Sequence, residues 1–135
     1  MLRLKLTIFV LMRSTFKKEE KLKSKILIEQ LFEKGENFTK FPLRIKFLKV
    51  DHTSENAIQA SFSAPKRKFK KAVDRNRIKR LMREAYRKNK HLLTDTINEK
   101  HIIMFTFIDE NEHKYVEIEE KMIFLLKLLI DKTKN

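Results

Sequence analysis

Residues 58–90, IQASFSAPKRKFKKAVDRNRIKRLMREAYRKNK, contain the change of hydrophobic period that decides the fold. As far as Ala64, apolar and polar residues alternate, which is typical of a strand with one buried face, and Pro65 ends the strand. From Lys71 to about Lys90 the apolar residues recur every three or four positions, as they do on one face of an α-helix. A strand that leads directly into a long helix predicts a fold containing both kinds of element.

Upstream of this stretch, the sequence predicts one helix and one more strand. Residues 24–35, SKILIEQLFEKG, have the apolar spacing of a helix, with Ser24 as the N-cap and Gly35, the single glycine, directly after the last turn. Residues 43–47 alternate as a half-buried strand. Because residues 51–56 have the composition of a turn, we expect the strands on either side of them to form an antiparallel hairpin.

Downstream, the sequence predicts a buried strand and a final helix. Residues 101–108, HIIMFTFI, are nearly all apolar, which suits a strand covered on both faces. The last segment has a broad helical stripe, and we expect Glu117 and Lys121 to pair one turn apart. The order helix, strands, helix, strand, helix predicts an α+β layer built on one sheet. The stripe consists of Val116, Ile118, Met122, Ile123, Leu125, Leu126, Leu129 and Ile130.

The length of 135 residues predicts one domain, which we expect to span residues 16–135. Residues 1–15 are expected to be a poorly ordered extension or to include a wrongly assigned start, with Met12 as the alternative first residue. Their uninterrupted apolar run, residues 7–12, is far shorter than the ~20 residues that span a bilayer. It also lacks the small-residue cleavage site of a signal peptide, so we expect a cytoplasmic protein without membrane attachment.

The composition excludes several classes of enzyme. The chain has no cysteine, so it has no thiolate nucleophile, disulfide or zinc knuckle. Its single glycine excludes the glycine-rich loops that hold nucleotide phosphates, so we expect no small-molecule cofactor. The four histidines are scattered and lack the spacing of a metal site. The acids Asp109, Glu110 and Glu112 are expected to interact with the dipole of the last helix rather than with a metal ion.

Positive charge is concentrated in one window of the sequence. Residues 66–90 contain 13 Lys and Arg side chains against Asp74 and Glu84, a net charge of +11 out of +14 for the chain. Helical geometry places Ile78, Leu81, Met82 and Ala85 on the apolar face, and on the opposite face it gathers Asn76, Lys79, Arg80, Arg83, Arg87 and Lys90, flanked by Arg75 and Arg77.

A solvated face normally mixes both signs of charge, whereas this one has almost no acids, so we predict that it binds a polyanion. A membrane surface is the weaker alternative, because the apolar stripe has no Trp or Phe and is needed to cover the sheet. The abundance of Arg favours structured RNA, since guanidinium groups grip phosphates bidentately and stack on exposed bases. Duplex DNA ranks lower, because no helix-turn-helix pattern surrounds the basic helix.

The string KFKKAVDRNRIKRLMREAYR resembles the basic helix of the protein subunit of bacterial ribonuclease P, which opens with Arg-Asn-Arg, here residues 75–77. The strings KLKSKILIEQLFEKGENFTKFPLRIKF and ASFSAPKRK are similar to that family's first helix and strands, so the likeness covers residues 16–129. The resemblance implies a single α/β-sandwich domain in the order α-β-β-β-α-β-α, with about four strands and a left-handed βαβ crossover.

The resemblance also implies a function and a set of partners. In that family an RNA subunit binds Mg²⁺ and cuts the 5′ leader from precursor tRNA, while the protein, inactive alone, binds both RNAs. We therefore expect a monomer in a 1:1 complex with the catalytic RNA. The charge pattern and the matched motif together predict RNA contacts from Lys66, Arg67, Lys68, Lys70, Lys71, Arg75, Asn76, Arg77, Lys79, Arg80, Arg83 and Arg87.

By the same resemblance, a cleft between the first helix and the polar sheet face would bind the leader. Its predicted residues are Phe16, Ile28, Phe32, Lys46, Ser61 and Ser63. The family often has aromatic residues where this chain has Ile28 and Lys46, which weakens a platform for base stacking. Phe32 has a second interpretation, as a residue of the core. Two other functions stay open at this stage: a ribosomal-protein-like RNA-binding or assembly factor, and a nuclease made of protein alone.

Overall fold

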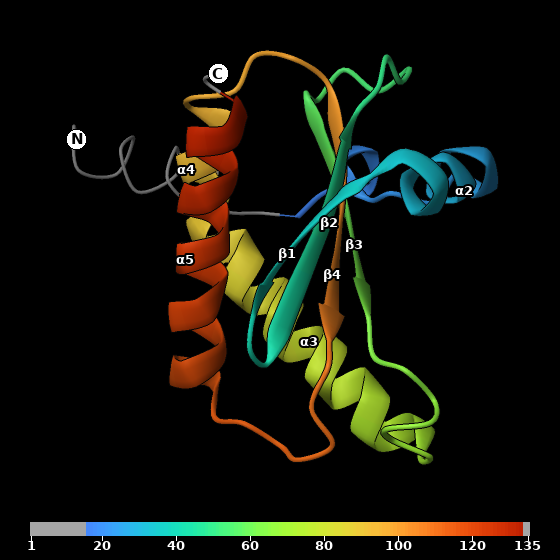
Figure 1. Cartoon of the computed structure of the whole chain (residues 1–135), viewed down its shortest axis with the longest axis vertical. Helices are drawn as coiled ribbons and strands as arrows, with labels where there is room; N and C mark the ends of the chain where they lie inside the picture. Colours follow the sequence, from blue (N-terminus) through green and yellow to red (C-terminus); the bar gives the residue numbers. More distant parts are fainter. Residues whose placement is uncertain (1–15, 134–135) are drawn as a thin grey trace, which may run out of the picture.

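The computed structural model describes residues 16–133, so the expectations for residues 1–15 and for the last two residues lie outside it. The chain forms a four-stranded sheet with helices on both faces, the predicted α/β sandwich (Figure 1). In chain order the elements are η1 (Lys18–Glu20), α2 (Lys25–Lys34), β1 (Glu36–Lys40), β2 (Leu43–Lys49), β3 (Ile58–Ser63), α3 (Ala72–Asn89), α4 (His91–Thr94), β4 (His101–Phe107) and α5 (Tyr115–Thr133).

The strand order β1-β2-β4-β3 corrects one prediction. The expected hairpin between residues 43–47 and 58–64 does not form, because β4 lies between β2 and β3, antiparallel to β2 and parallel to β3. Six of the seven residues of β4 are buried, and only a central position hides both faces of such a strand. The hairpin that does form joins β2 to β1, a strand whose pattern is mostly polar.

The path from β3 through α3 to β4 joins two neighbouring parallel strands, which is the crossover that the resemblance implies. The left-handedness of this crossover stays a prediction. The crossover starts in the 64–71 loop, where the buried ring of Phe69 packs against Phe107, with ring centroids 5.7 Å apart. This contact fixes the start of α3 against the end of the sheet.

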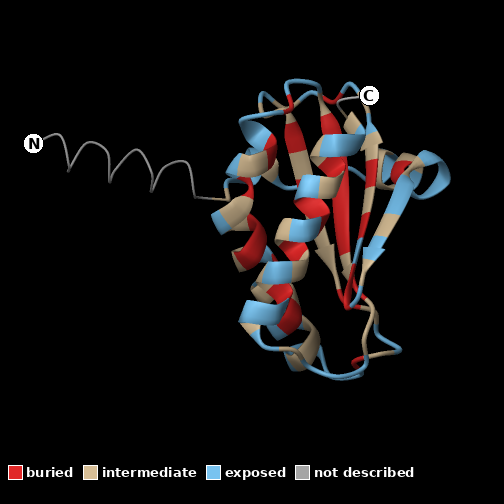
Figure 2. Cartoon of the chain, turned by 60° about the vertical axis from the view of Figure 1, so that its left-hand side comes forward, coloured by how far each residue is buried: buried red, intermediate tan, exposed pale blue. Residues whose placement is uncertain are grey.

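The two faces of the sheet are covered unequally (Figures 1 and 2). On one face, α3 and α5 pack over Leu43, Ile45 and the other inward residues of the strands to form the main core. On the other face lies α2 alone, with a small cluster of Leu22, Leu31, Ile102 and Met104. The rest of that face has no helix over it among the described elements, which leaves polar side chains of the sheet accessible.

The ends of α2 are set by Ser24 and Gly35, as predicted. The Ser24 hydroxyl accepts a hydrogen bond from the main-chain N of Leu27 (3.3 Å), so it caps the first turn. Gly35 is required by close approach rather than by its backbone angles, because a Cβ atom there would lie 2.4 Å from the carbonyl oxygen of Leu31. Phe32, on the last turn, is 57% exposed, which rejects its interpretation as a core residue.

Two details of α5 differ from the prediction. Val116 is 72% exposed and lies outside the apolar stripe, whose buried residues begin at Ile118. Glu117 pairs with His113, which precedes the helix, instead of with Lys121. No helix between residues 16 and 133 is both long and apolar enough to cross a membrane.

Candidate RNA interface

The middle of α3 presents the side chains predicted to bind a polyanion. The predicted apolar face packs inward, with Ile78, Met82 and Ala85 fully buried against the core and Leu81 partly buried. Asn76, Arg80 and Arg83 are exposed on the opposite side. Within residues 16–133, Arg80 and Arg83 form no ion pair, so both guanidinium groups can bind phosphate without losing a partner.

The two arginines of the Arg-Asn-Arg motif are engaged within the protein. Arg75 donates from one guanidinium nitrogen to the carbonyl oxygens of Phe69 (2.8 Å) and Lys70 (2.9 Å), which holds the 64–71 loop against the helix. Arg77 pairs with Asp74 at 3.3 Å and with Glu112 of the β4–α5 loop. The motif therefore positions the basic loop, and RNA must compete with two carboxylates for Arg77.

At the other end of α3, two more cations of the predicted face have carboxylate partners. Arg87 pairs with Glu84, and this hydrogen bond lowers the pKa of the Glu84 carboxyl below its ordinary value. Lys90 is 5% exposed and pairs with Glu20 of η1, so its place on the cationic face was wrongly predicted. Angular position on a helix cannot show that another segment covers the residue.

The 64–71 loop extends the cationic surface beyond the helix. Lys66, Arg67, Lys70 and Lys71 are exposed, and Lys68, which is half-buried, lies 3.9 Å from Glu110. Lys79 on α3 is half-buried. Together with Asn76, Arg80 and Arg83, these residues form what we call the cationic surface. Its helical residues lie on the side of the sheet that carries α3 and α5, and its loop residues lie beyond the end of β3.

A groove of about 240 Å³ lies on the opposite side of the sheet, beside the end of α2. Three of the six predicted cleft residues line it, namely Phe32, Lys46 and Ser63. Its other lining residues are Asn37, Arg44, Met104 and Thr106. Arg44 lies two residues before Lys46 on the same polar face of β2, so strand alternation could have identified Arg44 as a groove residue. Asn37 lies on β1, the strand that the sequence did not reveal.

The register explains why this part of the sheet is polar. One row of paired residues crosses all four strands and contains only Thr39, Arg44, Thr106 and Ser63. The next row contains Asn37, Lys46, Met104 and Ser61. Further along, Leu48 and Ile102 are neighbours under α2. The groove therefore occupies the place where α2 ends and the sheet face changes from apolar to polar.

The remaining three predicted cleft residues lie elsewhere or beside the groove. Ser61 belongs to the second polar row but does not line the groove. Ile28 is half-buried and packs into the small cluster under α2. Phe16 lies on the opposite sheet face, where its ring contacts Phe62 and Tyr86, each with ring centroids 5.8 Å apart. The structure therefore does not bring Phe16 to the groove.

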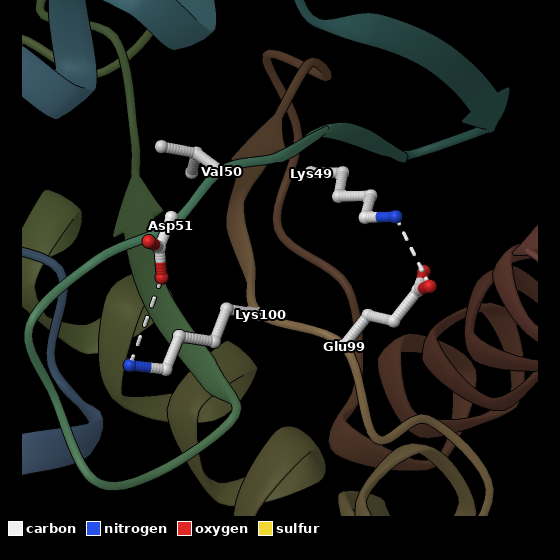
Figure 3. Close-up of a pocket in the computed structure, with 5 residues that line it drawn as sticks. All are labelled: Lys49, Val50, Asp51, Glu99 and Lys100. Carbon is white, nitrogen blue, oxygen red and sulfur yellow. Dashed lines mark ion pairs between the residues drawn. The ribbon is translucent and has the colours of Figure 1, made fainter.

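A second hollow, of about 480 Å³, lies where β2 ends and β4 begins (Figure 3). Its charged side chains point toward each other in pairs: Lys49 is 3.0 Å from Glu99, and Lys100 is 4.0 Å from Asp51. Lys100 also donates to the carbonyl oxygen of His52 (2.6 Å). Because each charge already has a partner, this hollow offers no net attraction for a charged ligand.

The acidic loop before α5 is used for ion pairs. Glu110 and Glu112 face Lys68 and Arg77, and Asp109 pairs with His113 at 2.5 Å. His113 lies between Asp109 and Glu117, and although burial of its ring opposes protonation, these carboxylates raise its pKa above the ordinary value. Among residues 16–133, no three His, Asp or Glu side chains gather in a way that could hold a metal ion.

Comparison with known proteins identifies relatives over most of the chain. The family model described as Ribonuclease P matches residues 16–129. The ribonuclease P protein component of Porphyromonas gingivalis is 37% identical over 109 residues, which cover 78% of this chain and 79% of that protein. That of Borreliella afzelii is 34% identical over 115 residues, covering 84% and 98% of the two chains.

Solved structures give the same answer for the fold. The RNase P protein of Staphylococcus aureus superimposes with a TM-score of 0.65 at 18% identity, covering 82% of this chain and 94% of that one. The RNase P protein of Thermotoga maritima also gives 0.65, at 21% identity, with 81% and 96% covered. At these identities the likeness shows the fold alone.

Proposed function

This chain belongs to the ribonuclease P protein family and has the tRNA-processing role of that family's protein component; we propose that it fills this role by binding two RNAs at two separate surfaces. The cationic surface of α3 and the 64–71 loop would bind the RNA subunit, and the groove would bind the 5′ leader of precursor tRNA. The alternative of a ribosomal-protein-like factor is not supported, because the family match extends over residues 16–129.

The observation that carries this proposal is the separation of the two surfaces by the sheet. The exposed Arg80 and Arg83 lie on the α3 side, where structured RNA offers closely spaced phosphates to guanidinium groups. The groove lies on the α2 side, where Phe32 of α2 and the polar face of the sheet line it, and we assign it to the single-stranded leader. One molecule can therefore hold both RNAs at once.

The chemistry of cleavage would belong to the RNA subunit. On this proposal, Mg²⁺ is bound within the ribonucleoprotein, the protein contributes binding and orientation, and a single copy joins each RNA in the cytoplasm. The acids that could have served a protein nuclease, Asp109, Glu110 and Glu112, are each paired with a basic side chain. A role in positioning substrate is consistent with that arrangement.

Reconstitution with a bacterial ribonuclease P RNA tests the proposal. We expect the protein alone not to cleave precursor tRNA, and to raise cleavage by the RNA at low Mg²⁺. Metal-dependent cleavage without RNA that is lost in Asp109→Asn or Glu112→Gln would contradict the proposal.

The two surfaces can be separated in the same assay. Lys46→Ala should weaken binding of precursor tRNA with a long leader and leave mature tRNA unaffected, whereas the double variant Arg80→Ala, Arg83→Ala should weaken assembly with the RNA subunit. Equal losses for both tRNAs with Lys46→Ala would remove the leader from the groove.

A further inference from the structure

We propose that the groove recognises the phosphates of a single-stranded leader rather than its bases, with Arg44 as a residue that determines this specificity. The inference rests on the proposed function, because it concerns how the same groove holds its RNA. It follows from three observations: the charges that line the groove, the contact of Lys46 with the Phe32 ring, and the polar row that crosses the sheet.

The first observation is that the lining of the groove, as formed by residues 16–133, contains two cations and no acid. Arg44 and Lys46 both project from β2, two residues apart, so they lie on the same face of the sheet at a spacing of about 7 Å. Arg44 is exposed and makes no ion pair with any residue from 16 to 133. Two unopposed cations along one strand suit two successive phosphates of an extended RNA backbone.

The second observation concerns Phe32, the one aromatic side chain that the described part of the chain contributes to the groove lining. The Lys46 ammonium lies 4.9 Å from the centre of the Phe32 ring and donates a hydrogen bond to the Phe32 carbonyl oxygen (3.1 Å). The cation therefore covers one face of the ring and is itself held in place by the main chain. A base could stack there only by displacing Lys46, so base stacking competes with a contact that already exists.

The third observation is the direction in which the polar row leads. Thr39, Arg44, Thr106 and Ser63 are paired across the sheet in that order. Ser63 is the last residue of β3, and the chain runs from it directly into the exposed cations Lys66 and Arg67. Hydroxyl groups and cations therefore continue from the groove toward the 64–71 loop. This row has no aromatic residue, so it can hold a backbone but offers no platform for bases.

Chemically modified leaders distinguish the two modes of recognition. Precursor tRNA is prepared with an unmodified leader, with an abasic leader that keeps its phosphates, and with a methylphosphonate leader that keeps its bases but loses the charges. The linkage at the cleavage site stays unmodified. Binding to the reconstituted holoenzyme is measured for each, with mature tRNA as the reference.

We expect the abasic leader to bind within about threefold of the unmodified one, and the methylphosphonate leader to bind at least about tenfold more weakly. Arg44→Ala should weaken binding of the unmodified and abasic leaders and leave the methylphosphonate leader nearly unchanged. Lys49→Ala is the matched control, since it removes the same charge from the same strand outside the groove. Phe32→Leu should reduce binding of the unmodified leader only slightly.

Loss of binding with the abasic leader, with or without loss for the methylphosphonate leader, would overturn the inference, as would an Arg44→Ala variant indistinguishable from Lys49→Ala. A different result identifies failure of the proposed function itself. If the unmodified precursor binds no more tightly than mature tRNA, the groove does not bind the leader at all.

Discussion

The middle of α3 and its two ends carry the same kind of side chain but make different contacts. In the middle, Arg80 and Arg83 are exposed and have no carboxylate partner in the described part of the chain. Toward the ends, four basic side chains have carbonyl or carboxylate partners: Arg75, Arg77 and Lys90 have partners in other segments, and Arg87 pairs with Glu84 of the same helix. The difference shows that positive charge alone does not identify a candidate RNA contact, because a carbonyl or carboxylate partner decides whether a cation is available.

The largest effect is expected for Lys90→Ala. Lys90 and Glu20 are both nearly buried, so removing the ammonium leaves a carboxylate without its partner and should lower the free energy of unfolding by about 3–5 kcal/mol. Lys88→Ala, two residues away and exposed against the Tyr115 ring, should cost less than about 1 kcal/mol. Denaturant unfolding measures both, and equal stabilities would show that Lys90 does not hold η1 against α3.

The next largest effect is expected for substitutions in the middle of α3, and it concerns RNA binding. If six to ten phosphates are neutralised, the logarithm of affinity for the RNA subunit should fall against the logarithm of salt concentration with a slope of roughly −4 to −9. The double variant Arg80→Ala, Arg83→Ala should reduce that slope by about one or two and leave thermal stability unchanged. The double variant Lys127→Ala, Lys132→Ala removes the same charge from exposed positions of α5 and should keep the slope.

A smaller effect, an increase in RNA affinity rather than a decrease, is expected from a change at the start of α3. Glu112→Gln removes one of the carboxylates bound to Arg77, so Arg77 becomes available to phosphate and RNA affinity should rise, by up to about fivefold for an exposed ion pair. Glu120→Gln removes the same charge from a different part of the surface and is the matched control. Weaker RNA binding by Glu112→Gln would show that the pair orients Arg77 for RNA instead of competing with it.

The smallest effect concerns the loop that carries Glu112, and it depends on pH. Because the folded protein raises the pKa of His113, protonated His113 stabilises the fold fully below its unfolded pKa of about 6.5, and this contribution is lost as pH rises through the folded pKa. We expect the free energy of unfolding to fall by up to about 1 kcal/mol across that range.

His113→Gln should abolish this pH dependence, whereas His91→Gln, at an exposed position of α4, should preserve it. Unfolding curves at several pH values measure the effect. A dependence that survives in His113→Gln would assign it to another group.

Local pattern predicted much of this fold because most of its elements bury one face. The alternation in β2 and β3, the caps of α2 and the apolar stripe of α3 all follow from rules that act within a few residues. Strand order does not follow from such local rules, because it depends on which strand must be covered on both faces. β1 escaped detection because its side chains are half-buried or exposed, so its position is set by pairing with β2 rather than by an apolar pattern.

The same limit applies to the candidate site. The cationic surface was predictable because a helix brings residues of one short segment together. The groove joins side chains from α2 and all four strands, and its second cation, Arg44, becomes significant only beside Phe32 and Thr106. Phe16 shows the converse: a residue close to the first helix in sequence lies on the other side of the sheet, since the 16–22 segment passes along β3 to the core.

The most direct test of the central claim is to map where the RNA subunit lies on the protein. The chain has no cysteine, so a single introduced cysteine can carry a thiol-reactive photocrosslinker without background labelling. We predict that Asn76→Cys, on the exposed face of α3, crosslinks to the RNA subunit in the reconstituted complex, and that Lys127→Cys, on the exposed face of α5, does not. Equal crosslinking from both positions, or crosslinking from α5 alone, would contradict the assignment of α3 as the surface that binds this RNA.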